Sequence, residues 1–394
     1  MSSNRGKLAK QQRAKKSFWL IIILSAVLIV FFVLVICLKP RVVRIIQQFS
    51  FSEPVLKIAA PFTGQLYFND QLGQNKLSEI VVKAIDESSQ TIELAVYSFD
   101  DQDIRDALYR AAARGVKVKL VLSTERQNVH DQLFKNLPDN IQRFDIDSNQ
   151  GYMHHKFLLV DRGKASGQLL FGSYNFTNLQ DKYDPSFLLV SQRAELIDTF
   201  GQEIDRLLGG QNSRNKLVNN DRLVNRFEYQ DGFLEIWFGP QKHSNGLKER
   251  MIGLISGTEN NLKAMIWNFT DKEVARAMLK VARHKPVNLL VDDSNWFGEY
   301  SVKNIIPGLR FDKLEIVTDA KRNQEVHQLS GQADLNSFLH HHMLLVDNQV
   351  VVFGTNNWSS GGFFNNDESV MISNIDLLTK PFEQSFLFNY TKNK

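Results

Sequence analysis

The sequence predicts an α/β protein built from two homologous halves related by a pseudo-twofold axis. Two observations lead to this fold class. Short strand-like segments alternate with amphipathic helical segments, which is typical of layered α/β folds. A pattern of polar and apolar residues that begins at His154 also recurs at His340. A separation of 186 residues is far too long for a solenoid repeat, so the simplest arrangement is one lobe for each copy.

The N-terminus is expected to anchor the protein in a membrane. Residues 1–16 contain six basic residues and no acidic one, and residues 17–38 include a run of 21 uncharged residues, long enough to cross a bilayer as a helix. No small-residue cleavage site follows the run, which favours an uncleaved anchor over a signal peptide. Six positive charges before the span and three after it predict a single-pass protein with a cytoplasmic N-terminus. The rest of the chain would then lie outside the cytoplasm, facing the periplasm in a bacterium.

The net charge of +4 comes from this anchor. Nine basic residues precede the first acidic residue, Glu53, and without them 38 basic residues face 43 acidic ones. The remainder therefore has a formal charge of about −5, which argues against a broadly cationic nucleic-acid surface. The single cysteine, Cys37, falls in the predicted span, so the exterior part must fold without disulfides.

The first half is expected at residues 61–210, after a juxtamembrane connector at 39–60. Gly115 is placed to end one of its helices. Apolar residues recur every three or four positions in the expected helices and alternate, or form short runs, in the expected strands. The helices are expected at 77–88, 103–114, 128–137 and 195–208, and the strands at 66–68, 92–99, 116–122 and 187–190.

A linker at 211–230, rich in polar residues, separates this half from a second one at 231–394. The same markers recur there, because Ile236-Trp237-Phe238 corresponds to Leu66-Tyr67-Phe68 and residues 264–269 correspond to 94–99. These markers lie 170 residues apart, whereas the two motif histidines lie 186 apart. The second half therefore has a longer insert before its motif, and we expect Arg310–Leu335 to include it as a loop beside the active site.

The motif has chemical content in its spacing. Side chains at i and i+2 of a strand share a face, so His154 projects with Lys156, and Ser173 projects with Asn175 after the Gly172 turn. An imidazole, an ammonium group, a hydroxyl and a carboxamide on one surface form a site for an oxyanion, most simply a phosphate. One such motif is usually a solvated strand edge, but two copies in matching context indicate an active site.

These residues resemble the signature of the phospholipase D superfamily, the HKD phosphodiesterases. The first copy has His154, Lys156, Asp161 and the turn Gly172-Ser173-Tyr174-Asn175. The second copy matches with His340, Asp347 and the turn Gly354-Thr355-Asn356-Asn357, but it has His342 where the family has lysine. The resemblance covers most of the chain from about residue 60, and the motif surroundings are similar to the bacterial nuclease branch. It implies two α-β-α sandwich repeats that pair within one chain, so that a monomer is sufficient.

The resemblance also implies a mechanism without a metal or another cofactor. One histidine attacks phosphorus and forms a phosphohistidine, while the other protonates the leaving group and then activates water. We assign the nucleophile to His154, because its copy is complete, and the acid and base to His340. The phosphate oxygens would be bound by Lys156, Asn175, Asn357 and the substituted His342, with supporting contacts from Ser173 and Thr355. Glu368 and Asp184 are candidates to orient a histidine through its Nδ1–H. Asp161 and Asp347 are expected to have structural roles.

The histidine at 342 leaves several alternatives open. An imidazole is charged mainly below about pH 6.5, so the second half-site would be weaker at neutral pH or the optimum would be acidic. A pseudoenzyme that only binds phosphate esters is the opposite interpretation. His340 and His342 also have metal-ligand spacing, and a metal-dependent hydrolase could add His327 and Asp334. The matching lysine in the first copy argues against it.

The remaining interpretations differ in the substrate, which is either a phospholipid or a nucleic acid. The anchor and the acidic exterior favour phospholipid, cleaved by water or transferred to an alcohol. The motif surroundings and the aromatics Tyr174, Phe176, Trp358, Phe363 and Phe364 favour DNA or RNA if these rings stack on bases. Such aromatics more often pack in a core. The sequence therefore predicts a membrane-anchored phosphodiesterase with a slight preference for phospholipid.

Overall fold

A computed structural model describes residues 55–72, 77–147, 151–213, 215–218, 223–240, 246–306, 312–332, 335 and 337–394. The chain forms two units, residues 1–50 and 51–394, and everything below concerns the second. The predicted cytoplasmic tail, the predicted span at 17–38 and the connector up to residue 54 lie outside the described residues. Within the described part, no helix is both long enough and apolar enough to cross a bilayer.

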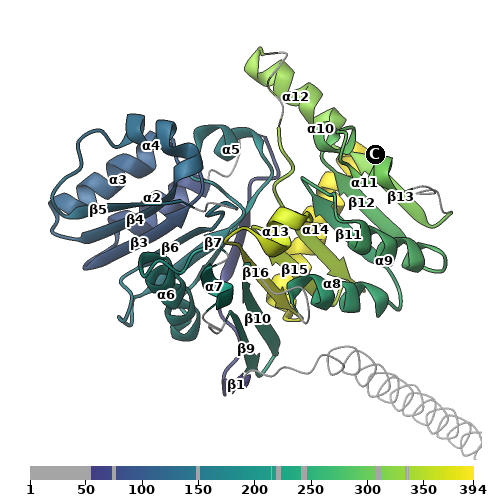
Figure 1. The fold of residues 1–394 in the computed structure, drawn as a ribbon, viewed down its shortest axis with the longest axis horizontal. Coiled ribbons are helices and arrows are strands. Elements are labelled where there is room, and N and C mark those ends of the chain that lie inside the picture. Colours follow the sequence, from purple (N-terminus) through teal and green to yellow (C-terminus); the bar gives the residue numbers. More distant parts are fainter. Residues whose placement is uncertain are drawn as a thin grey trace, which may run out of the picture. The chain divides into compact units, whose positions relative to one another are not determined.

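The first repeat contains a seven-stranded sheet, drawn in purple to teal in Figure 1. β3, β4 and β5 pair in parallel, and the other neighbours pair antiparallel. In sheet order the strands are β2 (Gln65–Phe68), β8 (Phe187–Ser191), β7 (Gln168–Gly172), β6 (Lys156–Val160), β3 (Thr91–Val96), β4 (Lys117–Ser123) and β5 (Ile141–Ile146). The helices are α2 (Leu77–Asp86), α3 (Gln102–Ala113), the 3₁₀ turn η1 (Thr124–Arg126), α4 (Gln127–Leu133), α5 (Asn178–Tyr183) and α6 (Ala194–Leu208).

The second repeat has the same strand order with two additional strands at one edge. In sheet order the strands are β1 (Val55–Lys57), β9 (Val224–Tyr229), β10 (Gly232–Phe238), β16 (Ser369–Ser373), β15 (Val350–Gly354), β14 (Met343–Val346), β11 (Leu262–Ile266), β12 (Val287–Val291) and β13 (Leu314–Thr318). The helices are α7 (Asn215–Val218), α8 (Leu247–Ser256), α9 (Lys272–Ala282), α10 (Asp293–Trp296), α11 (Val302–Ile305), α12 (Ala320–Ser330), α13 (Ser360–Phe364) and α14 (Asp376–Asn393). The predicted two-repeat α/β fold is confirmed.

Each central strand is buried on both faces, which explains its uninterrupted apolar sequence. On one face of the first sheet, Leu158 and Leu170 pack under α2 and α3. On the other face, Phe157 and Phe171 belong to a core that also contains α6 and residues of the second repeat. Phe353 of β15 lies 6.3 Å from Phe171, centroid to centroid. The two sheets therefore share a single core, which fixes the motif strands of the two repeats relative to each other.

Three segments differ from the expected organisation. The end of the expected connector forms β1, which pairs in parallel with β9, and β9 itself falls in the range expected to be a linker. The insert at 310–335 is not a loop in its described part, because it forms β13 and the helix α12. The sequence of α12 has no apolar stripe, since its buried residues are Arg322, Asn323 and Val326. Arg322 holds the helix in place by donating hydrogen bonds to the carbonyl oxygens of Asp70 (2.6 Å) and Tyr183 (2.8 Å) in the first repeat.

Candidate active site

The two motif histidines lie where the repeats meet, each just before its motif strand. The backbone N–H of His154 donates to the carbonyl oxygen of Asp367 in the second repeat (2.9 Å). The N–H of His340 donates in the same way to Pro185 in the first repeat (3.0 Å). Pro185 and Asp367 each lie two residues before an equivalent strand, β8 and β16. These reciprocal bonds express the predicted pseudo-twofold axis and bring both motifs to one site.

A carboxylate of the second repeat orients His154. Its Nδ1 lies 2.9 Å from Glu368 Oε2, and because a carboxylate only accepts, Nδ1 carries the proton and Nε2 keeps its lone pair. Oε2 also accepts from the Thr355 hydroxyl (2.5 Å), and Oε1 accepts from Asn366 Nδ2 (3.0 Å). Tyr97 packs edge-on against the imidazole, with centroids 4.9 Å apart. Burial lowers the pKa of His154, and the charge of Glu368 opposes this effect.

Lys156 supplies a buried cation beside His154. Its ammonium group is buried, donates to the carbonyl oxygen of His154 (3.0 Å) and lies 5.6 Å from the centre of the Tyr97 ring. Burial lowers its pKa to about 7, although Glu368 acts in the opposite direction. The ammonium is therefore near its titration point at neutral pH, and a bound phosphate would favour its charged form.

His340 has a different environment. It stacks on Trp267 with centroids 5.2 Å apart, the position held by Tyr97 in the first repeat. Its Nδ1 is buried and has no hydrogen-bond partner among the described residues. Burial lowers its pKa well below the usual value, and the charges of Lys156 and His154 add to the effect. His340 therefore lies close enough to the first motif for the charges of Lys156 and His154 to act on it.

His340 has no carboxylate partner at Nδ1 among the described residues, and the residue at the position equivalent to Glu368 explains why. Ser173 and Thr355 are equivalent, because their backbone N–H groups donate to Phe187 and Ser369, which begin β8 and β16. The residue before Ser369 is Glu368, and the residue before Phe187 is Ser186. Serine therefore occupies the orienting position of the second half-site. Its hydroxyl accepts from Gln180 (2.9 Å) and donates to the carbonyl oxygen of Asp184 (3.1 Å) instead.

Asp184, expected to orient a motif histidine, has another contact. Its Oδ1 accepts the backbone N–H of Phe338 at 2.9 Å, two residues before that histidine. Burial raises the pKa of Asp184 to about 7, while the Phe338 N–H and the Arg322 charge lower it. In the part of the chain that is described, no hydrogen bond joins Asp184 to an imidazole. The aspartate holds the segment that leads to His340 rather than the ring itself.

His342 lies in place of lysine with an unusual backbone. Its φ is +42°, in the left-handed region, and it precedes β14 rather than lying in it. Residues 340–342 are therefore not part of a strand, and the rings of His340 and His342 lie 5.4 Å apart, centroid to centroid. Both ring nitrogens of His342 are buried and lack a partner among described residues. Burial, followed by the neighbouring His340, lowers its pKa well below the usual value.

The remaining predicted residues divide into two groups. Asn175 and Asn357 are nearly buried, and neither side-chain oxygen has a partner in the described chain. The hydroxyls of Ser173 and Thr355 instead accept from the backbone of Phe187 (3.2 Å) and Ser369 (3.0 Å), so they join strands. Two aspartates have an evident structural role, since Asp161 accepts from the backbone of residues 89–91 and Asp347 from that of residues 259–261.

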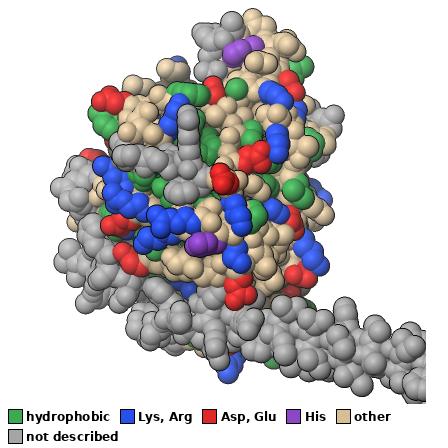
Figure 2. Space-filling model, turned by 90° about the vertical axis from the view of Figure 1, so that its right-hand side faces the viewer, with side chains coloured by type: hydrophobic (Ala, Val, Ile, Leu, Met, Phe, Trp, Pro, Cys, Tyr) green, Lys and Arg blue, Asp and Glu red, His purple; other side chains and the backbone are tan. Residues whose placement is uncertain are grey.

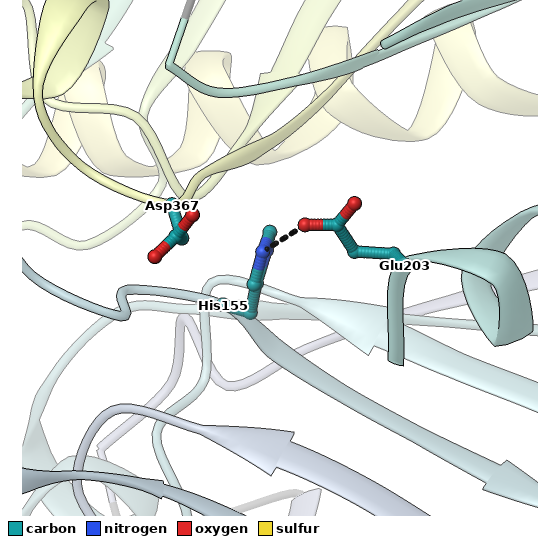
Figure 3. Close-up of side chains that lie close together, drawn as sticks. All are labelled: His155, Glu203 and Asp367. Carbon is teal, nitrogen blue, oxygen red and sulfur yellow. Dashed lines mark hydrogen bonds and ion pairs between the residues drawn. The ribbon is translucent and has the colours of Figure 1, made fainter. Parts of the chain in front are cut away.

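The middle histidine of each motif points away from the site, and its partners were not predicted. His155 Nε2 donates to Glu203 Oε1 (2.8 Å), and its Nδ1 lies 2.6 Å from Ser369 Oγ. Figure 3 shows the ring directed at Glu203 with Asp367 nearby. This trio has metal-ligand spacing. However, the ammonium group of Lys216 in α7 bridges both carboxylates, 2.6 Å from Asp367. The position of a cation is therefore filled by the protein itself. The equivalent His341 pairs with Asp70 (2.8 Å).

Comparison with known proteins decides the family. The family described as "Cardiolipin synthase, PLD-like domain" matches residues 81–208 and 251–388, one stretch in each repeat. The chain belongs to this phospholipase D-like family. The prediction of a two-repeat member of the phospholipase D superfamily is thereby confirmed.

Several relatives resemble parts of this PLD-like protein. A phospholipase D of Rickettsia bellii is 32% identical over 173 residues, 40% of this chain and 79% of the relative. A phospholipase D of Rickettsia conorii is 32% identical over 129 residues, 32% of this chain and 60% of the relative. Human mitochondrial cardiolipin hydrolase is 24% identical over 135 residues, 34% of this chain and 52% of the relative. The chain thus spans less than two thirds of the length of the last two relatives.

Solved structures resemble the PLD-like fold as a whole. Phosphatidylserine synthase of Haemophilus influenzae superposes with a TM-score of 0.61 at 16% identity, over 90% of this chain and 91% of that structure. Polyphosphate kinase of Porphyromonas gingivalis gives a TM-score of 0.52 at 13% identity, over 79% of this chain and 47% of that one. At these identities the likeness establishes the fold alone.

Proposed function

We propose that the protein is a phosphodiesterase of the phospholipase D type that acts on phospholipids through a phosphohistidine on His154. The observation that carries this proposal is the contact of His154 Nδ1 with Glu368 across the two repeats. It leaves Nε2 unprotonated, and it places a negative charge where the imidazolium forms when Nε2 bonds to phosphorus.

The first step forms the N–P bond and breaks the bond from phosphorus to the alcohol oxygen. A protonated His340 donates its proton to the departing oxygen. Lys156, with the amide groups of Asn175 and Asn357, stabilises the non-bridging oxygens. In the second step His340, now neutral, takes a proton from water, whose oxygen attacks phosphorus and releases His154. An alcohol in place of water gives transfer instead of hydrolysis with the same residues.

This scheme requires His340 and Lys156 in their protonated forms, although burial favours the neutral form of both groups in the free site. Burial lowers the pKa of His340 well below its usual value and that of Lys156 to about 7. Both groups act in their protonated forms, so the rate should fall as the pH rises through neutrality. His342 adds no charge there, because its own pKa is also lowered well below the usual value. The proposal therefore includes an acidic optimum.

Phospholipid is preferred to nucleic acid for a structural reason. Of the aromatics expected to stack on bases, Tyr174, Phe176, Trp358 and Phe363 are buried. Phe364 is half-buried and lies under the ammonium group of Lys248, 4.9 Å from the ring centre. The aromatic rings of the two motif turns therefore pack within the protein, as core residues do, and are not placed to stack on bases.

We also propose that residues 17–38 anchor the enzyme as a single membrane span, with the catalytic repeats outside the cytoplasm. The charge asymmetry around that run supports this orientation. A reporter fused after Lys394 tests it, since alkaline phosphatase would be active there and a cytoplasmic reporter inactive. The reverse pattern would refute the orientation without affecting the chemistry.

The deciding experiment uses the full chain in detergent solution, with His154→Ala as its control. Both proteins are incubated with a chelator on phosphatidylcholine or phosphatidylglycerol vesicles, and in parallel on single-stranded DNA and RNA. Release of phosphatidic acid by the wild type alone supports the proposal, and a phosphatidyl-alcohol product with added ethanol identifies transfer. Shortened oligonucleotides with intact lipid would identify a nuclease instead. Wild type and variant equally inactive on every substrate would leave the phosphate-ester-binding pseudoenzyme.

A further inference from the structure

Helix α9 of the second repeat has a basic face that the equivalent helix α3 of the first repeat lacks. Lys272, Arg276 and Lys280 of α9, with Arg283 just after it, are exposed and recur at helical spacing on one side. We refer to these four residues as the basic stripe. Figure 2 faces the right-hand side of Figure 1, where α9 lies, and shows Lys and Arg side chains gathered around a histidine. In the described chain, neither Lys272 nor Lys280 forms a salt bridge, so these charges are available to a partner.

The equivalent helix of the first repeat has no such face. On α3, Arg105 pairs with Asp106 (2.6 Å), and Arg110 pairs with Asp86 of α2 (2.8 Å). Acidic and basic residues alternate there and neutralise each other. Because α3 and α9 hold the same place in the two repeats, the stripe is not imposed by the fold. It distinguishes one side of the molecule from the other.

An aromatic lip adjoins the start of this helix. Phe297 and Tyr300, between α10 and α11, have 62% and 72% of their surfaces exposed. The Lys303 ammonium group lies 3.6 Å from the centre of the Phe297 ring. Exposed aromatic rings beside lysine are the residue types that settle at the boundary between lipid headgroups and acyl chains.

Both ends of the lip segment are bonded to residues next to the active site. At one end, Asp292 caps α10 and accepts the N–H of Leu339 (3.2 Å), the residue before His340. At the other end, the N–H of Val302 donates to Phe269 (3.1 Å), two residues after the Trp267 ring that stacks on His340. α11 also packs against α9. The lip is therefore at the rim of the catalytic site, and the basic stripe continues from it.

We propose that the basic stripe and the aromatic lip dock the second repeat on an anionic phospholipid surface, which presents lipid to the active site. This inference rests on the proposed phospholipid substrate. The cations match the charge of an anionic headgroup layer, and the exposed rings match its apolar margin. A single-stranded nucleic acid also carries negative charge, so the test below includes it.

The test compares three full-length proteins in detergent solution. The stripe variant is Lys272→Gln/Arg276→Gln/Lys280→Gln, and the matched control is Lys117→Gln/Lys135→Gln/Lys164→Gln, which removes three exposed charges from the first repeat. Substrates are bis(p-nitrophenyl) phosphate in solution, single-stranded DNA, and vesicles of phosphatidylcholine with or without phosphatidylglycerol. Each cation contributes about a fivefold factor at an anionic surface, so three give up to about a hundredfold.

We expect the stripe variant to raise KM on phosphatidylglycerol vesicles by tenfold or more, with kcat and the rate on the soluble ester unchanged. The control should match the wild type on every substrate. Phe297→Asn/Tyr300→Asn should raise KM on both kinds of vesicle. Equal KM values for stripe variant and wild type on anionic vesicles would overturn the proposal. So would a defect of the stripe variant confined to single-stranded DNA.

A second readout separates docking from catalysis. An environment-sensitive dye is attached at Tyr300→Cys in a Cys37→Ser background, and its emission is recorded as phosphatidylglycerol vesicles are added. A blue shift that the stripe substitutions abolish supports docking even if wild type and His154→Ala hydrolyse nothing, in which case only the proposed activity fails. The same shift with and without the stripe refutes docking even in an active enzyme.

Discussion

Replacing Glu368 by glutamine tests the orientation of the nucleophile with almost no change in shape. Both carboxylate oxygens are acceptors, because Oε1 receives Asn366 Nδ2 and Oε2 receives His154 Nδ1–H. Glutamine has only one acceptor oxygen. Asn366 cannot turn over to compensate, because its own Oδ1 accepts the backbone N–H of Tyr152 (3.0 Å). The glutamine amide nitrogen must therefore face His154.

A donor facing Nδ1 forces the proton of His154 onto Nε2 and removes the lone pair that attacks phosphorus in the proposed mechanism. The alternative rotamer of the introduced glutamine keeps the His154 bond but places two N–H donors against each other at Asn366. Loss of a hydrogen bond to a charged group costs about 1.5–3 kcal/mol, and 1.36 kcal/mol is tenfold in rate. We therefore expect kcat on a soluble phosphodiester to fall by about 10- to 150-fold in Glu368→Gln.

The second substitution Asn366→Asp provides a rescue. An aspartate at this position accepts both the amide N–H of the introduced glutamine and the Tyr152 N–H, so the glutamine oxygen can face His154 again. We expect the double variant to recover most of the lost kcat, measured at the optimum pH of each protein, with melting temperatures recorded by circular dichroism. A single variant within twofold of wild type, or a double variant no better than the single one, would refute the reasoning.

The same site yields three further predictions. On a soluble phosphodiester, kcat/KM should fall as pH rises above about 7, because Lys156 has a pKa of about 7 and acts when protonated; a flat profile between about pH 5.5 and 8 would contradict it. At about pH 6, below the pKa of about 7 that burial gives Lys156, His342→Lys should raise kcat/KM by about three- to tenfold through an added cation. No gain would show that the second half-site binds no charged oxygen. Asp161→Ala should lower the free energy of unfolding, measured by urea denaturation, by about 2–3 kcal/mol, because the carboxylate accepts several backbone N–H groups. The kcat of this variant should stay unchanged. A large loss of kcat would assign Asp161 to the site.

The elements with a strong apolar pattern could be predicted from the sequence, and those fixed by polar contacts could not. β6 and β14 follow from their apolar runs, and the repeat follows from the two motifs. α12 has a polar sequence and is positioned by Arg322, which bonds to residues 139 and 252 positions away in the chain. No local pattern carries that information.

The orienting residues illustrate the same limit within the site. The acidic residues 11 and 9 positions beyond the motif asparagines both look suitable, but only Glu368 contacts a histidine. Glu368 lies 11 positions beyond Asn357, and the residue 11 positions beyond Asn175 is Ser186, so the equivalent of Glu368 in the first repeat is a serine. This equivalence can be assigned only from the structure, where Ser173 and Thr355 bond to the first residues of equivalent strands. The network of Glu203 and Lys216 gave no sequence signal, because its members are separated in the chain.

The covalent fusion of the two repeats has an evolutionary consequence. In a symmetric dimer of identical chains, any substitution appears at both half-sites, so loss of the carboxylate or the lysine would disable both histidines together. In a single chain the copies mutate independently. Ser186 and His342 occupy positions of one half-site at which the other half-site has Glu368 and Lys156. A single chain can therefore hold two unlike half-sites, which a symmetric dimer of identical chains cannot.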